Sequence, residues 1–218
     1  MSKSTDKTLG ECIRRALEEE MHESALDINI YVKDGSVQLT GFVDVLSERI
    51  TAERIAAGVP GVKRVANSIT IGTEGYITDR HIERELEAKL YSGRYGNLDR
   101  VSVNVRDGSA VLMGTTANYA QNKQAEGLAA ATRGVVNVVS NLHVENEGLY
   151  DDATLTGWAV QALSTADLSQ QDIDVNVRNG DVTLSGWVRN REEVALAEEL
   201  VSRVEGIRKV HNRLNTRA

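Results

Sequence analysis

The sequence predicts an α+β protein of three tandem αββαβ modules, each a three-stranded mixed sheet with two helices on one face. One observation is a segment that recurs without gaps at 28–43, 101–116 and 173–188, at offsets of 73 and 72 residues. The others are apolar–polar alternation inside that segment and apolar residues at helical spacing around it. Because this period is too long for a solenoid repeat, we place self-contained modules at 5–74, 77–147 and 150–218.

Each module begins with large or small aliphatic residues at every fourth position. This spacing puts them on one face of an amphipathic helix. The residues are Leu9, Ile13 and Leu17 in the first module, Ile82, Leu86 and Leu90 in the second, and Leu155, Ala159 and Leu163 in the third.

A hairpin follows this helix. In its first strand, Ile28, Ile30 and Val32 alternate with polar residues, as in a half-buried strand. Asp-Gly or Asn-Gly then predicts a type I′ turn, because both central residues need positive φ. These turns are Asp34-Gly35, Asp107-Gly108 and Asn179-Gly180.

The second strand of each hairpin ends at a glycine, which in a strand marks a close approach of another backbone. The glycines are Gly41, Gly114 and Gly186. We expect the second helix to cross the sheet there, because it carries a small residue at equivalent positions. These small residues, Ala52, Ala125 and Ala197, and their large neighbours Ile55, Leu128 and Leu200 form its predicted buried face.

Capping boxes predict where the second helix begins, at Asn118 with Gln121 and at Asn190 with Glu193. A glycine after the helix leads into the third strand. The glycines are Gly61, Gly134 and Gly206, and the strands contain Val65 and Ile69, Val138 and Leu142, and Val210 and Leu214.

The composition limits the classes of function. The 218 residues carry a net charge of −7 and no basic segment, so we expect no nucleic-acid partner. No stretch approaches the ~18 apolar residues of a transmembrane helix. Met1 to Glu20 holds no signal-peptide stretch, so the sequence as written predicts a cytoplasmic protein, or a periplasmic one if a signal has been removed. Cys12 is the single cysteine, which excludes an intramolecular disulfide.

No catalytic, cofactor or metal site is predicted. The four histidines fall at non-equivalent positions of the repeat and no pair has metal-ligand spacing. Gly58-Val59-Pro60-Gly61 has the spacing of the GxxG loop of RNA-binding KH domains. Since Gly58 does not recur in the other copies, a turn that ends the helix is the favoured interpretation.

Two sets of surface residues are candidates for binding. The first is basic and is our candidate for contact with a membrane or lipid: Lys63, Arg64, Arg208, Lys209 and Arg213, with Arg203 and Arg217 nearby. The second is apolar, on the outward sheet faces, and is our candidate interaction surface: Tyr31, Phe42, Met113 and Trp187. Trp158 precedes Ala159 and either flanks the core or lies exposed.

These motifs together resemble the BON domain, a family named for bacterial osmotically inducible protein Y and nodulation proteins. The resemblance rests on the (Asp/Asn)-Gly hairpin, the strand-ending glycine, and Gly-(Val/Ile)-x-x-Val before the last strand, in all three copies. It implies an αββαβ fold, a bacterial source, no catalytic residues, and a role in envelope or osmotic stress with phospholipid binding. The alternative function is a structural or chaperone-like protein that binds itself or other proteins through its sheet faces.

Overall fold

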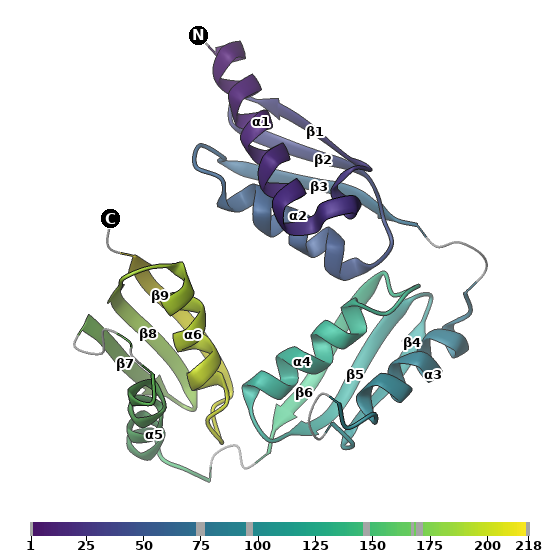
Figure 1. The fold of residues 1–218 in the computed structure, drawn as a ribbon. Coiled ribbons are helices and arrows are strands. Elements are labelled where there is room, and N and C mark those ends of the chain that lie inside the picture. The colour runs from purple at the N-terminus through teal and green to yellow at the C-terminus, as the bar shows by residue number, and fades with distance from the viewer. Residues whose placement is uncertain are drawn as a thin grey trace. The chain divides into compact units, whose positions relative to one another are not determined.

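The computed structural model repeats one arrangement of helices and strands three times along the chain (Figure 1). It describes residues 2–72, 77–94, 98–145, 149–166, 168 and 172–216. The predicted joints at 74–77 and 147–150 lie mostly outside these residues, as does Arg217. The first module comprises α1 (Ser2–Met21), a 3₁₀ turn (His22–Ala25), β1 (Ile28–Lys33), β2 (Ser36–Val43), α2 (Leu46–Gly58) and β3 (Arg64–Ile71).

The second and third modules follow the same order. The second comprises α3 (Asp79–Leu90), β4 (Val101–Arg106), β5 (Ser109–Thr116), α4 (Tyr119–Ala130) and β6 (Asn137–Val144). The third comprises α5 (Asp152–Ser164), β7 (Ile173–Arg178), β8 (Asp181–Val188), α6 (Arg191–Ser202) and β9 (Lys209–Thr216).

Each sheet has its second strand in the centre, in the orders β1-β2-β3, β4-β5-β6 and β7-β8-β9. The hairpin partner β1 is antiparallel to β2, whereas β3 returns parallel to β2 after the crossover through α2. β7, β8 and β9 pair in the same way. In each module both helices cover one face of the sheet (Figure 1). The predicted α+β fold of three mixed sheets is therefore confirmed.

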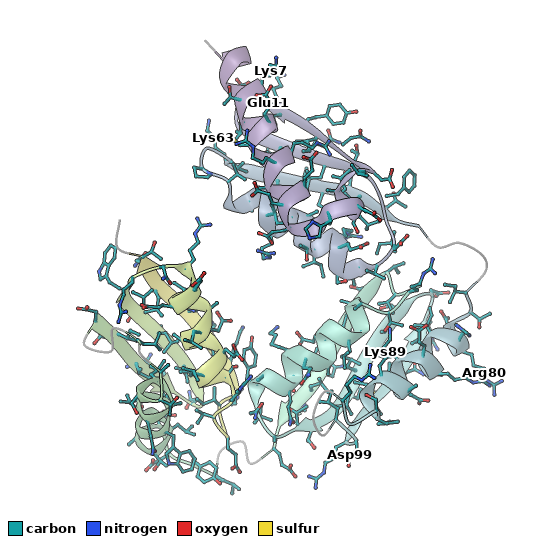
Figure 2. All side chains as sticks on the ribbon, viewed as in Figure 1. Lys7, Glu11, Lys63, Arg80, Lys89 and Asp99 are labelled. Atoms are coloured by element: carbon teal, nitrogen blue, oxygen red, sulfur yellow. The ribbon has the colours of Figure 1, made fainter. Side chains whose placement is uncertain are left out.

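The predicted apolar face of the first helix forms the core of each module. In the first module Ile13 and Leu17 are fully buried against Ile28 and Leu39 of the sheet. The polar side of α1 faces solvent, and there Lys7 and Glu11 form an exposed ion pair one helical turn apart, with Nζ and Oε1 separated by 3.9 Å (Figure 2). Burial of its apolar stripe against the sheet therefore stabilises this helix.

The small residues of the second helix are fully buried, as predicted: Ala52, Ala125 and Ala197 have no exposed surface. Their large neighbours differ between modules, since Ile55 is buried but Leu128 and Leu200 are only half-buried. The predicted N-caps Asn118 and Asn190 are also present, although the return bonds reach the residue before each cap, from the Ala117 N–H to Gln121 Oε1 and from the Arg189 N–H to Glu193 Oε2, both at 2.9 Å. The Gln121 N–H donates to Asn118 Oδ1 at 3.1 Å and the Glu193 N–H to Asn190 Oδ1 at 2.9 Å.

The expected crossing of the second helix at the strand glycines is wrong. A Cβ on Gly41 would lie 1.9 Å from the carbonyl oxygen of Asp27, the residue before β1. Gly114 and Gly186 meet the Arg100 and Asp172 carbonyls in the same way, at 2.1 and 1.9 Å. All three glycines have φ between +115° and +125°. The close approach comes from the edge strand of the same hairpin, because each glycine lies opposite the first residue of that strand.

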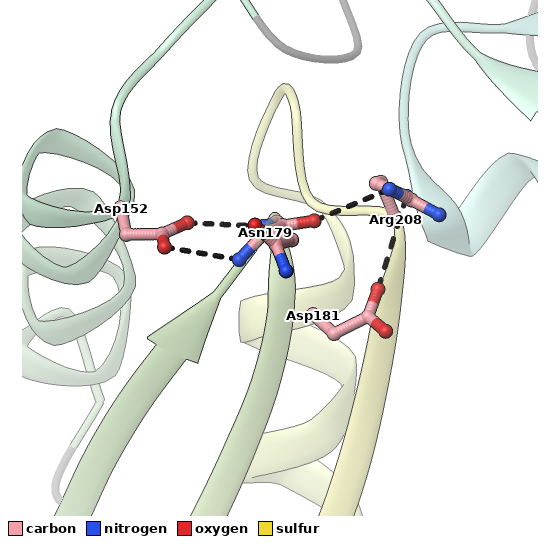
Figure 3. A network of polar contacts seen from close by, with 5 residues as sticks. Asp152, Asn179, Asp181 and Arg208 are labelled. Carbon is pink, nitrogen blue, oxygen red and sulfur yellow. Dashed lines mark hydrogen bonds and ion pairs between the residues drawn. The ribbon is translucent and has the colours of Figure 1, made fainter.

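The hairpin turns have the predicted conformation, with φ near +50° at Asp34, Asp107 and Asn179 and near +75° at the following glycines. A carboxylate from the first helix holds each turn. Asp152 at the start of α5 accepts the Asn179 and Gly180 N–H groups at 2.9 and 3.1 Å (Figure 3).

Asp79 holds the Asp107 and Gly108 N–H groups, and Asp6 those of Asp34 and Gly35, at 2.8 to 3.3 Å. We call this the aspartate clamp. The sequence interpretation missed it, although Asp6, Asp79 and Asp152 each precede the first core residue of their helix by three positions.

Removing the clamp in the third module should destabilise that module. Asp152→Ala leaves two turn N–H groups without a charged acceptor, so we expect its free energy of unfolding to fall by about 1.5–3 kcal/mol. Trp158 and Trp187 are the only tryptophans of the chain and both belong to this module. Urea unfolding followed by tryptophan fluorescence therefore reports on it. Asp174→Ala, an exposed carboxylate on β7, should change the value by less than about 0.5 kcal/mol.

A side chain at the strand glycine should be more harmful. Gly186→Ala forces a Cβ into the Asp172 carbonyl at positive φ, so the fluorescence transition should lose about 3 kcal/mol or more. The matched control is Gly157→Ala in α5, where a Cβ meets nothing within 4 Å. Since alanine favours the helix, this control should gain about 0.5–1 kcal/mol. Equal stability of the two variants would contradict the close-approach explanation.

Candidate functional site

The outward face of each sheet carries the predicted apolar candidates. In the first module Tyr31 and Phe42 are 61% and 63% exposed. Tyr31 lies opposite Gln38 on β2, and Phe42 is four residues further along that strand. At about 3.3 Å per residue the two aromatic residues lie about 13 Å apart along the sheet. Both are on the face that the helices leave uncovered, but they do not form one cluster.

The third module combines the two candidate sets on one face. Trp187 of β8 is 50% exposed and pairs with Asn215 of β9. Arg213 pairs with Ser185, so it lies diagonally next to Trp187, within reach of a long side chain. His211 and Lys209 follow on the same side of β9, because alternate residues of a strand share a face, and Lys209, opposite Asp181 of β8, lies about 20 Å along the sheet from Trp187. Lys209 and Arg213 are exposed.

The remaining basic candidates are tied to the hairpin turns. The Lys63 Nζ donates to the Asp34 carbonyl at 3.2 Å, and Arg64 reaches Ser36 Oγ at 3.3 Å. Arg208 donates to the Asn179 carbonyl at 3.4 Å, and its Nε lies 3.9 Å from Asp181 Oδ1 (Figure 3). These three cations therefore have partners within their own modules, whereas Lys209 and Arg213 project from the sheet.

The side chains around Phe42 are acidic, in contrast to these basic candidates. A groove of about 460 Å³ beside it is lined by Glu23, Asp27, Asp44 and Glu48. Glu48 is engaged, since it accepts from the Ser24 hydroxyl at 2.6 Å and from the Asp44 N–H at 2.9 Å. The cation nearest to Trp187 is Arg213, whereas carboxylates line the groove beside Phe42, so of these two equivalent positions Trp187 suits an anionic ligand better. The outward face of the third sheet also carries the carboxylates Asp174 and Asp181.

The structure also gives positions for the three remaining candidates from the sequence. Met113 lies on the outward side of β5 and is 41% exposed. Trp158 flanks the core of the third module and stacks edge-to-face on Tyr150, with ring centroids 4.7 Å apart. Gly58 ends α2, and the Val62 N–H then bonds the Val59 carbonyl at 3.1 Å. Gly58-Val59-Pro60-Gly61 is therefore the helix-ending turn that the sequence favoured.

Within the described part of the chain, no three His, Cys, Asp or Glu side chains gather as a metal site would require. In that same part, no helix has both the length and the apolar character needed to cross a bilayer.

Comparison with known proteins finds a matching family model and similar sequences. The family model described as BON domain matches residues 5–73, 78–146 and 151–218. Osmotically-inducible protein Y of Escherichia coli (strain K12) is 29% identical over 143 residues, which cover 63% of this chain and 71% of that protein. An uncharacterised protein in the gshII 5′ region of Anaplasma centrale is 27% identical over 127 residues, 56% of this chain and 84% of that protein.

Solved structures are more distant. The C-terminal domain of CdsD, a structural protein of the type III secretion system of Chlamydia trachomatis, is 14% identical with a TM-score of 0.28. The alignment covers 94% of this chain and 96% of that domain. A score this low carries no argument about this chain.

Proposed function

Since the chain belongs to the BON domain family in three successive segments, we propose that it is a non-enzymatic binding protein whose third module contacts anionic phospholipid surfaces. The similarity to osmotically-inducible protein Y supports a role in osmotic or general stress. In this role the protein acts at the envelope by binding.

One observation carries the proposal: Trp187, Lys209 and Arg213 project from the same uncovered sheet face. Peripheral binding to a bilayer needs cations near the anionic head groups and an apolar or aromatic group at their level. Tryptophan suits this position because its ring is apolar and its N–H is polar. The face supplies both kinds of group from two neighbouring strands.

We expect the full chain to co-sediment with phosphatidylglycerol vesicles at low salt and not with phosphatidylcholine vesicles. Each cation near the surface contributes about 1 kcal/mol, so Lys209→Gln with Arg213→Gln should weaken binding on the order of thirtyfold. Trp187→Ser should also weaken it, whereas Phe42→Ser should not, because four carboxylates line the groove beside Phe42. High salt should abolish the binding, since it screens surface charges.

The matched control is Arg80→Gln with Arg84→Gln, which removes the same charge from exposed positions of α3. If this pair weakens binding as much as the β9 pair, net charge alone governs the interaction and the proposed face is wrong. Absence of any binding to anionic vesicles at low salt also contradicts the proposal.

The exposed aromatic residues favour a second candidate, a chaperone-like protein that holds clients on its sheet faces. Phe42, 63% exposed beside a groove, is the observation behind it. On this view Phe42→Ser with Trp187→Ser should lose the ability to suppress the aggregation of reduced insulin, measured by light scattering. Unchanged suppression, or none by the unmodified chain, would rule out this candidate.

A further inference from the structure

The outer edge of β1 presents backbone groups that no described residue of the chain satisfies. β1 pairs with β2 on one side only, because it is an edge strand of its sheet. In an antiparallel pair, alternate residues direct both N–H and C=O toward the partner. The Asp27 carbonyl accepts from Phe42 at 3.3 Å, which directs Asp27, Asn29, Tyr31 and Lys33 toward β2. Ile30 and Val32 therefore direct their N–H and C=O groups outward.

Both ends of this outer edge are closed by contacts within the module. The Ile28 carbonyl accepts from Arg14 Nη2 at 2.7 Å, and the Asp34 N–H donates to Asp6 at 3.0 Å. Only Ile30 and Val32 remain between them, with two donors and two acceptors in total. A strand added here can form four hydrogen bonds if its own pattern matches this short edge.

A groove runs along this edge, between the outer side of α1 and β1. Its volume is about 990 Å³, and it is lined on the strand side by Ile30 to Asp34. On the helix side the lining includes Lys7, Glu11, Arg14 and Glu18. These four residues recur at three- and four-residue spacing, so they form one stripe along α1 with alternating charge.

We infer that the partner of this edge is a second copy of the chain, whose β1 pairs with β1 in antiparallel orientation about a two-fold axis through Tyr31. With Tyr31 opposite its own copy, Ile30 lies opposite Val32 of the partner and all four outward groups are bonded. A shift that centres the axis on Ile30 needs the Ile28 carbonyl, which Arg14 occupies. A shift to Val32 needs Asp34, which is in the turn at φ +52°.

The charges of α1 are complementary under the same axis. α1 runs opposite to β1: Asp6 contacts the turn, Gly10 lies over Val32 with its Cβ position 3.6 Å away, and Arg14 reaches Ile28. One strand residue advances about as far as two helix residues, so the level of Tyr31 is close to residue 12. A residue that lies a given distance before that level then faces, in the second copy, the residue that lies the same distance after it. Lys7 faces Glu18 of the second copy and Glu11 faces Arg14.

The other two modules lack this surface. At the positions of Lys7, Glu11, Arg14 and Glu18, the second module has Arg80, Arg84, Glu87 and Tyr91, and the third has Ala153, Gly157, Val160 and Ser164. Tyr31 is replaced by Asn104 and Asn176. In the second module Glu83 stands in place of Gly10 and reaches Asn104 at 3.5 Å. The pairing therefore produces a closed dimer through the first module and not an open array.

Sedimentation velocity of the full chain over a range of concentrations tests the helix contact. We expect a monomer–dimer equilibrium. Lys7→Glu places two glutamates opposite each other at both ends of the stripe, so dimerisation should weaken at least tenfold. Adding Glu18→Lys to this variant restores both pairs in swapped form and should recover the dimer. A monomer at every concentration, or a double variant no better than Lys7→Glu, overturns the inference.

A disulfide tests the strand register directly. In a Cys12→Ser background, Tyr31→Cys should oxidise to a covalent dimer, because non-hydrogen-bonded antiparallel pairs place Cα atoms ~4.5 Å apart, within disulfide range. Lys33→Cys lies on the same face but about 13 Å from its copy, so it should remain unlinked. Linking of both cysteines, or of Lys33→Cys alone, contradicts this register. The dimer surface is separate from the third-module face, so vesicle binding and dimerisation can each fail without the other.

Discussion

The aspartate clamp is the interaction on which the rest of each module depends. A hairpin turn with two residues at positive φ leaves N–H groups at the end of the sheet, and a carboxylate of the first helix accepts both. Two contacts from one side chain fix both the distance and the rotation of the helix relative to the hairpin. The apolar stripe of that helix is then aligned over the inner face of the sheet. The order of elements alone does not set this alignment, because an apolar stripe can slide on an apolar face.

The same turn also determines how the basic residues are used. The residue immediately before the third strand donates its N–H to the carbonyl of the turn glycine in every module, from Lys63, Val136 and Arg208 at 2.9 to 3.0 Å. This hydrogen bond uses only the backbone, so any side chain is compatible with it and the position varies between valine and a cation. Where a cation is present, its side chain donates to the carbonyl of the other turn residue, Asp34 for Lys63 and Asn179 for Arg208. The outward positions of β9 have no such constraint, and there Lys209 and Arg213 project from the sheet, with Arg213 diagonally next to Trp187.

One scaffold therefore presents three different surfaces. The inner face of each sheet is restricted by the helices that cover it, and residues there are alike in all copies. The outward face and the edge of the first strand are not covered by the helices of the module. Tyr31, Asn104 and Asn176 occupy one outward position, and Phe42, Thr115 and Trp187 another. Because these residues contribute little to the core, each module can carry its own binding chemistry without loss of the fold.

The turn type and the buried stripes were predictable from the sequence because each depends on neighbours within about ten residues, and the repeat was predictable because the same pattern recurs at offsets of 73 and 72 residues. Gly41 shows where this reasoning ends. Its need for a close approach was visible, but the approaching group, the Asp27 carbonyl, is set by strand register. Arg208 and Lys209 are adjacent and equally basic in sequence, yet one is tied to a turn and the other projects from the sheet. Only the tertiary structure distinguishes the two residues, because their surroundings are set by pairing with residues nearly thirty positions away in the sequence.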